Sequence, residues 1–383
     1  MMAVPTASPE NRTIALREPV VFVRRTWPHW AHHGGYDRLF PAVETLLGRG
    51  QLSCYANPGR TPSWLTARVL ERFKAHAVWS PDTYRAPHAV AAELRALWTA
   101  RRRHASIIHV AELETSFGLL GHARARHWLR DARVVATTHL PASWWRLFGD
   151  PAVVAHLDAL VTVSSEQRDF FEPYLPGRVS YIPHGIDTDF FSPEPGNRPA
   201  FGERRCLCVG ELYRDMPMLA EVIERMMRSD AAVRFDLVYP DHGRGRDRQT
   251  LTRIARQSRV HWHSGLSDEQ LRELYRRADL LVLPLVDCTA NNALLEAMAC
   301  GVPILTTDLP GVRDYAQPTC AHVTPPHDAA SMADAAQALL ADPARRAAMG
   351  AAARRDAETR FAWPIIARQW IELYAQVCDL PRT

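Results

Sequence analysis

The chain has 383 residues, of which 47% are hydrophobic and 23% charged, and this length suits two domains of ordinary size. The composition excludes a disordered chain, and no apolar run reaches the roughly 18 residues of a membrane-spanning helix. The formal net charge of +4 allows a phosphate-bearing partner, whereas scattered arginines without interleaved aromatic residues argue against nucleic acid.

In the first half of the chain, short runs rich in β-branched residues alternate with helical patterns. A first strand is expected over residues 19–25, followed by a loop that passes through Gly34 and Gly35 into an amphipathic helix. Further strands are expected to begin at Ser106, Arg133, Asp158 and Arg178. This alternation predicts parallel strands joined by crossover helices.

A polar segment rich in proline and glycine, SPEPGNRP at residues 192–199, separates two halves of similar pattern. After it, strands are expected near residues 205–212, 233–240, 260–265, 280–285 and 302–308, with helices over 216–227, 248–257, 268–277, around Glu296, and over 329–359. We therefore predict an α/β fold with two doubly wound Rossmann-like domains, residues 1–192 and 200–362, and an active cleft between their strand ends. An apolar stripe predicts a final helix, residues 363–383, that crosses back to the first domain.

The segment TANNALLEAMACG, residues 289–301, places small polar residues before a short apolar helix. The start of a helix offers free N–H groups and a positive dipole end to an anion, and Thr289, Asn291 and Asn292 can cap it. Glu296, about one turn deeper, can accept ribose hydroxyl hydrogen bonds worth roughly 1.5–3 kcal/mol each. The residues alone leave a second interpretation open, in which this is a capped core helix whose glutamate faces solvent or a salt bridge.

The longer segment LRELYRRADLLVLPLVDCTANNALLEAMACGVPILTTDLPGVRDY, residues 271–315, resembles the donor-site region of the retaining glycosyltransferases of family 4. The segments ALVTVSSEQRDFF, VSYIPHGIDTDFFSP and CLCVGEL support the resemblance, which covers the second half of the chain and the end of the first. It implies the two-domain GT-B architecture and transfer of a sugar from a nucleotide diphosphate donor.

The resemblance also assigns roles to individual residues of this segment. Glu296 matches the second acid of a Glu-x7-Glu motif, which binds the donor ribose. Cys288 stands where the first acid, which contacts the transferred sugar, is expected, and Asp287 beside it is a substitute if the motif is shifted by one residue. The main-chain amides that match the diphosphate-binding backbone are those of Asn292, Ala293 and Leu294.

Gly210 matches a phosphate-binding glycine at the end of the second domain's first strand. Glu211 replaces the arginine that follows it in the family, and no lysine comes after, so Arg214 is the nearest cation. We expect Arg214 to neutralise charge on the leaving diphosphate, although an exposed loop arginine is the alternative.

In the first domain, Gly34 and Gly35 match the family's glycine loop near the donor diphosphate. His139, at the end of a strand, matches a histidine near the transferred sugar, although a packed or capping histidine is equally compatible with the residues alone. Candidates for an acceptor-side contact are His109, Glu112 and Glu114. We expect four tryptophans in loops, where they can stack on a sugar or lie against lipid headgroups, although ordinary packing is the preferred account of any one of them: Trp27, Trp30, Trp144 and Trp145.

The tripeptide Asp187-Thr-Asp189 spells the Asp-x-Asp motif of metal-dependent glycosyltransferases. It falls within VSYIPHGIDTDFFSP, where the resembling family has no metal site. We therefore expect neither a divalent metal nor another cofactor to take part in the chemistry.

Taken together, the resemblance implies a metal-independent, hexosyltransferase-type enzyme, for which we expect a UDP- or GDP-sugar donor and a glycan or lipid-linked acceptor. The N-terminal segment lacks secretory-signal features and the seven cysteines include no CxxC pair, so a cytoplasmic protein is expected, with peripheral membrane contact compatible. Lys74 is the single lysine, a bias typical of GC-rich bacterial genomes. Two alternatives stay open: a non-catalytic glycosyltransferase-like subunit and a nucleotide-sugar 2-epimerase.

Overall fold

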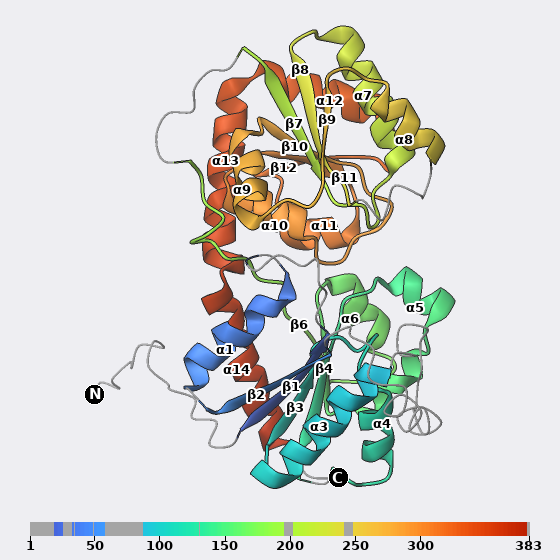
Figure 1. The fold of residues 1–383 in the computed structure, drawn as a ribbon, viewed down its shortest axis with the longest axis vertical. Helices are drawn as coiled ribbons and strands as arrows, with labels where there is room; N and C mark the ends of the chain where they lie inside the picture. Colours follow the sequence, from blue (N-terminus) through green and yellow to red (C-terminus); the bar gives the residue numbers. More distant parts are fainter. Residues whose placement is uncertain are drawn as a thin grey trace, which may run out of the picture.

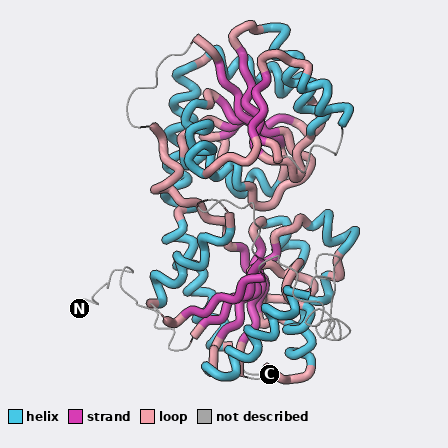
Figure 2. Tube along the Cα trace, viewed as in Figure 1, coloured by secondary structure: helices cyan, strands magenta, loops and turns pink. Residues whose placement is uncertain are grey.

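The computed structural model describes residues 19–25, 33, 35–48, 50–57, 87–129, 131–194, 202–240 and 248–380. Two six-stranded sheets form its framework, with strand orders β2-β1-β3-β4-β5-β6 and β12-β11-β10-β7-β8-β9. Neighbouring strands are parallel in both sheets, and helices flank each sheet (Figures 1 and 2). The predicted α/β class with two doubly wound units is confirmed.

The first sheet lies in the part of the chain that we call the first domain. Its strands are β1 (Val20–Arg25), β2 (Leu52–Asn57), β3 (Ile107–Val110), β4 (Arg133–Thr138), β5 (Ala159–Thr162) and β6 (Val179–Tyr181). Its helices are η2 (Tyr36–Arg38), α1 (Leu39–Leu47), α3 (Pro87–Arg103), α4 (Gly118–Ala125), α5 (Ala142–Phe148), η4 (Pro151–His156) and α6 (Ser165–Phe171). Alternate strand residues pack on opposite faces, so that Val21 and Val23 meet α3 and α4 while Val20 and Phe22 meet α1.

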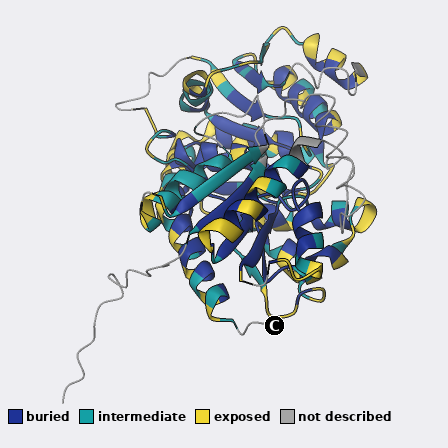
Figure 3. Ribbon diagram, turned by 60° about the horizontal axis from the view of Figure 1, so that its bottom comes forward, coloured by how far each residue is buried: buried dark blue, intermediate teal, exposed yellow. Residues whose placement is uncertain are grey.

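The second sheet defines the second domain. Its strands are β7 (Arg204–Val209), β8 (Val233–Val238), β9 (Val260–His263), β10 (Leu280–Leu283), β11 (Ile304–Thr307) and β12 (Ala321–Thr324). Its helices are α7 (Met216–Ser229), α8 (Arg248–Ala255), α9 (Asp268–Arg277), α10 (Asn292–Ala299), α11 (Pro310–Tyr315), α12 (Ala329–Ala341) and α13 (Pro343–Asp356). Central strands β10 and β11 are buried along their whole length, and Figure 3 shows exposed residues gathered on the outer helices.

The prediction of a single helix over residues 329–359 is wrong, because the structure has two helices there, α12 and α13. The structure breaks it at Asp342, whose side chain accepts a hydrogen bond from the Arg345 amide at 2.9 Å, and Pro343 begins α13. Proline at the first helical position has no N–H to lose, so this junction suits a new helix start. A π-helical turn over Ala357–Phe361 follows and leads to the last helix.

The last helix, α14 (Trp363–Asp379), packs against the first sheet rather than the second. Trp370 and Tyr374 of α14 are buried, and Tyr374 Oη lies 2.7 Å from Nδ1 of His109. The His109 ring also stacks on Trp370 with centroids 4.3 Å apart. His109 is therefore a fully buried residue of the first domain's interior and not an acceptor-side contact. Within the described ranges, no helix has the length and apolar character needed to cross a bilayer.

Candidate functional site

The loop after β7 holds Arg214 in a fixed position. Gly210 has a φ of +87°, which favours glycine, and a Cβ there would lie only 2.9 Å from Nη2 of Arg214. Nε and Nη2 of Arg214 donate to the Val209 carbonyl at 2.9 and 2.6 Å, and Nη1 donates to the Leu212 carbonyl at 2.8 Å. Nη2 also lies 3.5 Å from Oδ1 of Asn291. The guanidinium thus faces the start of α10, which disagrees with the exposed-loop alternative.

Asn291 caps the start of α10. Its side-chain Oδ1 accepts a hydrogen bond from the Ala293 amide at 3.1 Å, and its carbonyl accepts one from the Leu294 amide at 3.1 Å. Two of the three amides predicted to bind a diphosphate are therefore already engaged within the loop, while no partner of the Asn292 amide is found among the described residues. An anion at this position would accept hydrogen bonds from the same N–H groups that now donate to Asn291.

Glu296 lies on the buried face of α10 and is 5% exposed. Its Oε2 accepts a hydrogen bond from the hydroxyl of Tyr275, on α9, at 2.8 Å. Burial, with a smaller contribution from the charge of Asp268, raises the pKa of Glu296 to about 7. The alternative in which this glutamate faces solvent is therefore wrong.

Cys288 and Asp287 occupy the region of the expected first acid. The Cys288 thiol is buried and donates to the Thr289 carbonyl at 3.1 Å, and burial raises its pKa to about 12. Asp287 reaches the other domain, because its Oδ2 accepts a hydrogen bond from the hydroxyl of Ser143, while its Oδ1 accepts one from the Cys288 amide at 2.7 Å. The carboxylate at position 287 is thus engaged between the domains, and the thiol stays neutral.

A close contact between the backbones of Gly311 and Cys288 fixes the loop that precedes α10. A Cβ added at Gly311, on α11, would lie 2.1 Å from the carbonyl oxygen of Cys288. Only a residue without a side chain fits this contact, so Gly311 sets the position of the loop that ends at Asn291.

His139 belongs to the first domain, where it directly follows β4. Its Nε2 lies 2.9 Å from the Ala111 carbonyl, which can only accept, so Nε2 carries the proton. Burial lowers the pKa of His139, although the charge of Glu114 acts in the opposite direction. The ring is therefore neutral near pH 7, and its Nδ1 is a hydrogen-bond acceptor.

The carboxylate of Glu114 organises the loop that carries His139. A single oxygen, Oε1, accepts hydrogen bonds from the Thr138 hydroxyl at 2.7 Å and from the amides of His139 and Leu140 at 2.6 and 2.8 Å. Glu114 is buried, and its role is to position this loop. An acid shortly after a strand was a signal for it in the sequence, but its hydrogen-bond partners could not be read there.

The two sides meet along a surface that we call the seam, defined by the contacts of Ser143 with Asp287 and of Thr289 with His139. The Thr289 hydroxyl donates to the His139 carbonyl at 2.7 Å. Tyr213 also lies here, because its carbonyl accepts a hydrogen bond from the amide of Val286, the neighbour of Asp287, at 3.0 Å. Burial and the charges of Asp287 and Glu114 raise the pKa of Tyr213 to about 12. The seam therefore brings the loops of His139, Arg214 and α10 together. Sequence reasoning missed two of its residues, Ser143 and Tyr213, which carried no motif.

The glycine loop of the first domain is tied to the second. Gly34 lies outside the described residues, and Gly35 directly precedes η2. The amide of His33 donates to the Asp268 carboxylate, on α9, at 2.7 Å. The described end of this loop thus contacts the helix that supplies the hydroxyl partner of Glu296.

Asp187 of the Asp-x-Asp sequence forms an ion pair with Arg38 and a hydrogen bond with His33. Nδ1 of His33 lies 2.9 Å from Oδ2 of Asp187, and Nη2 of Arg38 donates to the same oxygen at 3.0 Å. Burial acts to raise the pKa of Asp187, but the net shift is downward. The hydrogen bonds from His33 and the Phe190 amide, together with the charge of Arg38, outweigh the effect of burial. In this arrangement Asp187 fastens the glycine loop.

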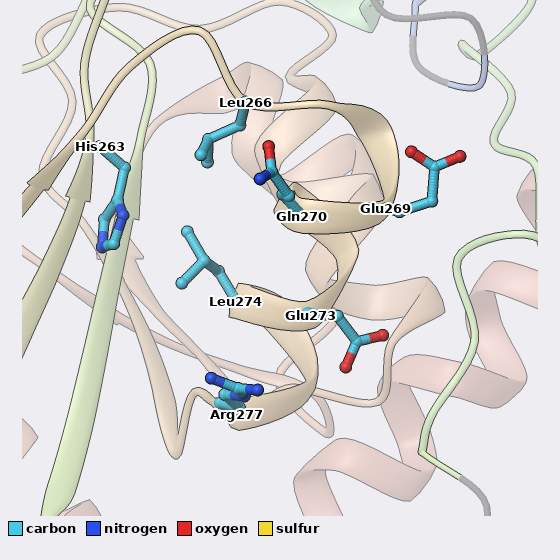
Figure 4. Close-up of a pocket in the computed structure, with 7 residues that line it drawn as sticks. All are labelled: His263, Leu266, Glu269, Gln270, Glu273, Leu274 and Arg277. Atoms are coloured by element: carbon cyan, nitrogen blue, oxygen red, sulfur yellow. The ribbon is translucent and has the colours of Figure 1, made fainter.

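A pocket of about 380 Å³ lies beside α9 and shares no residue with the predicted donor site. It is bounded by His263 on β9 and by Leu266 and Leu274, and Figure 4 shows Glu269 and Glu273 pointing away from His263. Its lining carries a mixture of apolar and charged groups without a convergent polar set, so it adds nothing to the candidate site.

Comparison with known families agrees with this arrangement of loops on two parallel sheets. A sequence profile described as "Glycosyltransferase Family 4" matches residues 51–190, and one described as "Glycosyl transferases group 1" matches residues 203–342. The two profiles together cover most of both domains. The chain belongs to the family 4 glycosyltransferases.

Curated relatives of this glycosyltransferase agree with its membership of family 4. It is 29% identical to a D-inositol 3-phosphate glycosyltransferase of Xylanimonas cellulosilytica, over 68% of this chain and 69% of the relative. The alignments with curated relatives cover between 52% and 69% of those proteins' own lengths.

Solved structures of other proteins share its fold, and two of them illustrate the likeness. The sucrose-phosphate synthase of Thermosynechococcus elongatus has a TM-score of 0.71 at 19% identity, covering 94% of this chain and 99% of that one. The Anabaena protein HepE, solved in complex with UDP-glucose, has a TM-score of 0.69 at 15% identity, covering 94% of this chain and 100% of that one. The predicted GT-B architecture is thereby confirmed.

Proposed function

We propose that this protein transfers a sugar, with retention of configuration, from a UDP- or GDP-sugar to a glycan or lipid-linked acceptor. The observation that carries the proposal is the seam, where the loop of the neutral His139 contacts the loop that leads into α10, the helix of the buried Glu296, with Arg214 held at the start of that helix. The UDP-glucose bound by the Anabaena relative in fold supports a nucleotide-sugar donor. We further propose a cytoplasmic location, with peripheral contact at the inner face of the membrane.

On the donor side, Glu296 would bind the ribose and Arg214 the diphosphate. Each oxygen of an ionised carboxylate can accept two hydrogen bonds, and the Tyr275 hydroxyl uses one of these positions on Glu296. Glu296 can therefore still accept hydrogen bonds from two ribose hydroxyls. Arg214 needs little reorganisation, since main-chain carbonyls already hold its guanidinium at the start of α10. A preorganised cation stabilises charge that develops on a leaving diphosphate.

On the sugar side, His139 would accept a hydrogen bond from a sugar hydroxyl at Nδ1, since its Nε2 is committed to the Ala111 carbonyl. No protein nucleophile is required if the donor's β-phosphate oxygen takes the acceptor proton on the face from which the hydroxyl attacks. The bond from the anomeric carbon to the diphosphate then breaks as the bond to the acceptor oxygen forms. Cys288, as a buried neutral thiol, does not offer an alternative nucleophile.

We also propose that the chemistry uses no divalent metal. The acid that suggested one, Asp187, is paired with His33 and Arg38. An acceptor with an apolar portion is supported by Leu147 and Phe148 at the end of α5, which are 74% and 69% exposed. They follow Ser143, the α5 residue that contacts the second domain at the seam.

Calorimetry with UDP, GDP and the matching nucleotide sugars tests the donor assignment, and Arg214→Ala should weaken nucleotide diphosphate binding by about tenfold or more, the scale of one charge-assisted hydrogen bond. Arg225→Ala, an exposed arginine of α7, is the matched control and should bind like the wild type. The anomeric configuration of the product, measured by NMR, tests retention.

Three outcomes would change the proposal. Binding without turnover on any acceptor extract would favour the non-catalytic subunit, and release of a free epimerised nucleotide sugar without an acceptor would favour the 2-epimerase. Absence of binding to every nucleotide tested would overturn the donor site as a whole.

A further inference from the structure

A second cavity, of about 550 Å³, lies at the pole of the first domain away from the second domain. Its charged and titratable lining residues are Arg124, His127, Arg133, His156, Asp158 and Arg178. They lie around the amino ends of β4, β5 and β6, whereas His139 follows the carboxyl end of β4. Six residues of strand at about 3.3 Å each separate the cavity from the seam by about 20 Å. Figure 1 shows α4 and the end of α14 at this pole.

One buried carboxylate forms the centre of the cluster. Oδ1 of Asp158 accepts from Nη2 of Arg124 at 2.6 Å and from Nη1 of Arg133 at 3.2 Å. Oδ2 accepts from the Val134 amide at 2.7 Å. The side chains of Asp158 and Arg133 are only 5% and 9% exposed, so water screens this group of charges poorly.

The arginines outnumber the acid. Their other hydrogen bonds in the described chain go to main-chain carbonyls, namely those of Leu129, Ala132, Leu157 and Leu380. Carbonyl dipoles orient a guanidinium but carry no net charge. Two guanidinium groups therefore share one carboxylate, and a third, that of Arg178, donates only to a carbonyl, so the three arginines and one acid of the lining leave two positive charges in excess. Arg124 and Arg133 are largely buried with one carboxylate between them, and the excess positive charge at this poorly screened end of the cavity is costly unless an anion compensates it.

We propose that this cavity is a binding site for a phosphomonoester, separate from the donor site. A phosphomonoester carries a charge of about −1.5 to −2 near pH 7, which matches the two unbalanced positive charges. Guanidinium groups also present paired N–H donors that suit phosphate oxygens. The cavity has a volume typical of ligand pockets and far exceeds the roughly 30 Å³ of one water molecule, so it has room for an organic group on the ester.

Two sources share this chemistry, a soluble phosphorylated metabolite and the headgroup of a phosphomonoester lipid. Calorimetry with glycerol 3-phosphate probes the first, and flotation with vesicles of phosphatidic acid in phosphatidylcholine, against pure phosphatidylcholine, probes the second. Arg178 is the residue to change because it is exposed, so that its replacement does not break the buried Asp158 cluster. Arg178→Glu should weaken binding of the responding probe by about tenfold or more, the scale of one charge-assisted hydrogen bond.

Three further variants make the test specific. Arg168→Glu reverses an exposed arginine of α6 that pairs with Asp169, and it should bind like the wild type. Arg214→Ala should leave this binding unchanged, because Arg214 belongs to the second domain. Arg178→Lys keeps the charge but not the paired N–H donors, so it should lose less affinity than Arg178→Glu. A wild-type melting temperature of Arg178→Glu would show that its loss of binding is not unfolding.

A response to glycerol 3-phosphate supports the soluble source, and a response to phosphatidic acid vesicles alone supports the lipid source. Binding that is lost in Arg214→Ala but kept in Arg178→Glu would place the phosphate in the donor site and overturn the inference. No response to either probe would overturn it as well. These results are independent of whether the protein transfers a sugar.

Discussion

The two sides of the seam are built in different ways. On the second-domain side, main-chain carbonyls hold Arg214, and Gly311 fixes the loop before α10 through a contact that admits no side chain. On the first-domain side, one carboxylate oxygen of Glu114 accepts three hydrogen bonds that place the His139 loop. The backbone thus determines the donor side, whereas the opposite side depends on a single side chain. Substitutions should therefore act on the two sides through different kinetic constants.

The largest effect is expected for Glu296→Gln. The amide keeps the shape of the side chain and an oxygen for the Tyr275 hydroxyl, but it loses the charge that strengthens hydrogen bonds from a ribose. With charge-assisted hydrogen bonds worth roughly 1.5–3 kcal/mol each, we expect kcat/KM for the donor to fall by about 100-fold. Glu273→Gln, on the half-exposed surface of α9, is the matched control. An unchanged kcat/KM would remove Glu296 from the donor site.

Cys288→Glu should be the most destabilising change. The thiol is 3% exposed, so a longer acidic side chain must displace the surrounding loop or bury a charge. Overpacking and burial of an acid together should lower the free energy of unfolding by about 3 kcal/mol, measured by urea denaturation. Cys288→Ser, which differs little in size, should lose much less. A stable Cys288→Glu variant with faster turnover would show instead that position 288 reaches the sugar as the family motif implies.

Glu114→Gln tests the first-domain side of the comparison. The three donors to Oε1 keep an acceptor, but each hydrogen bond loses its charge assistance, about 1 kcal/mol apiece. We expect kcat to fall by about tenfold while KM for the donor changes little, because only the His139 loop loosens. Glu112→Gln, two residues away, accepts from Thr115 and should have the smaller effect. A rise in donor KM without loss of kcat would contradict the division of labour between the two sides.

The pH dependence of donor binding should follow Glu296. Its pKa is raised from 4.5 to about 7 by burial, so the folded protein keeps the proton over a range in which the unfolded chain has lost it. Stability should therefore decrease as pH rises from about 4.5 to about 7. Donor affinity should change in the opposite direction and increase through pH 7, since the ribose hydroxyls need the carboxylate as acceptor. Calorimetry across this range should show a flat profile for Glu296→Gln, and an unchanged slope would exclude Glu296 as its source.

Much of the fold was predictable because parallel strands buried on both faces are continuous apolar runs. β10 and β11 are of this kind, and both were expected from the sequence. The edge strands β2 and β12 were not expected, since β2 is partly exposed and its pattern, LSCYAN, is less apolar. The break at Asp342 was missed because the alanine-rich pattern continues on both sides of Pro343.

The candidate site was predictable where its residues are close together in the chain. The residues from Asp287 to Glu296 form one contiguous segment, and the family motif locates them. Ser143 and Glu114 come from separate first-domain elements, and their target atoms are main-chain groups or a residue of the other domain. Such pairings depend on the tertiary fold and leave no spacing in the sequence. The candidate role of His109 failed for the same reason, because two of its partners, Tyr374 and Trp370, lie on α14, which is distant in the chain.

The smallest effect is expected for Ser143→Ala, and it decides how the seam uses Asp287. The substitution removes the hydroxyl that donates to Oδ2 of Asp287 across the domains. If the contact only joins the domains, its loss should cost about 0.5–1.5 kcal/mol and change kcat by a small factor. If Asp287 replaces the missing first acid, freeing its carboxylate should lower KM for the donor sugar, while Asp287→Asn should raise it. Measuring both variants with one donor separates the two roles, and an equal loss in both would assign Asp287 to domain contact alone.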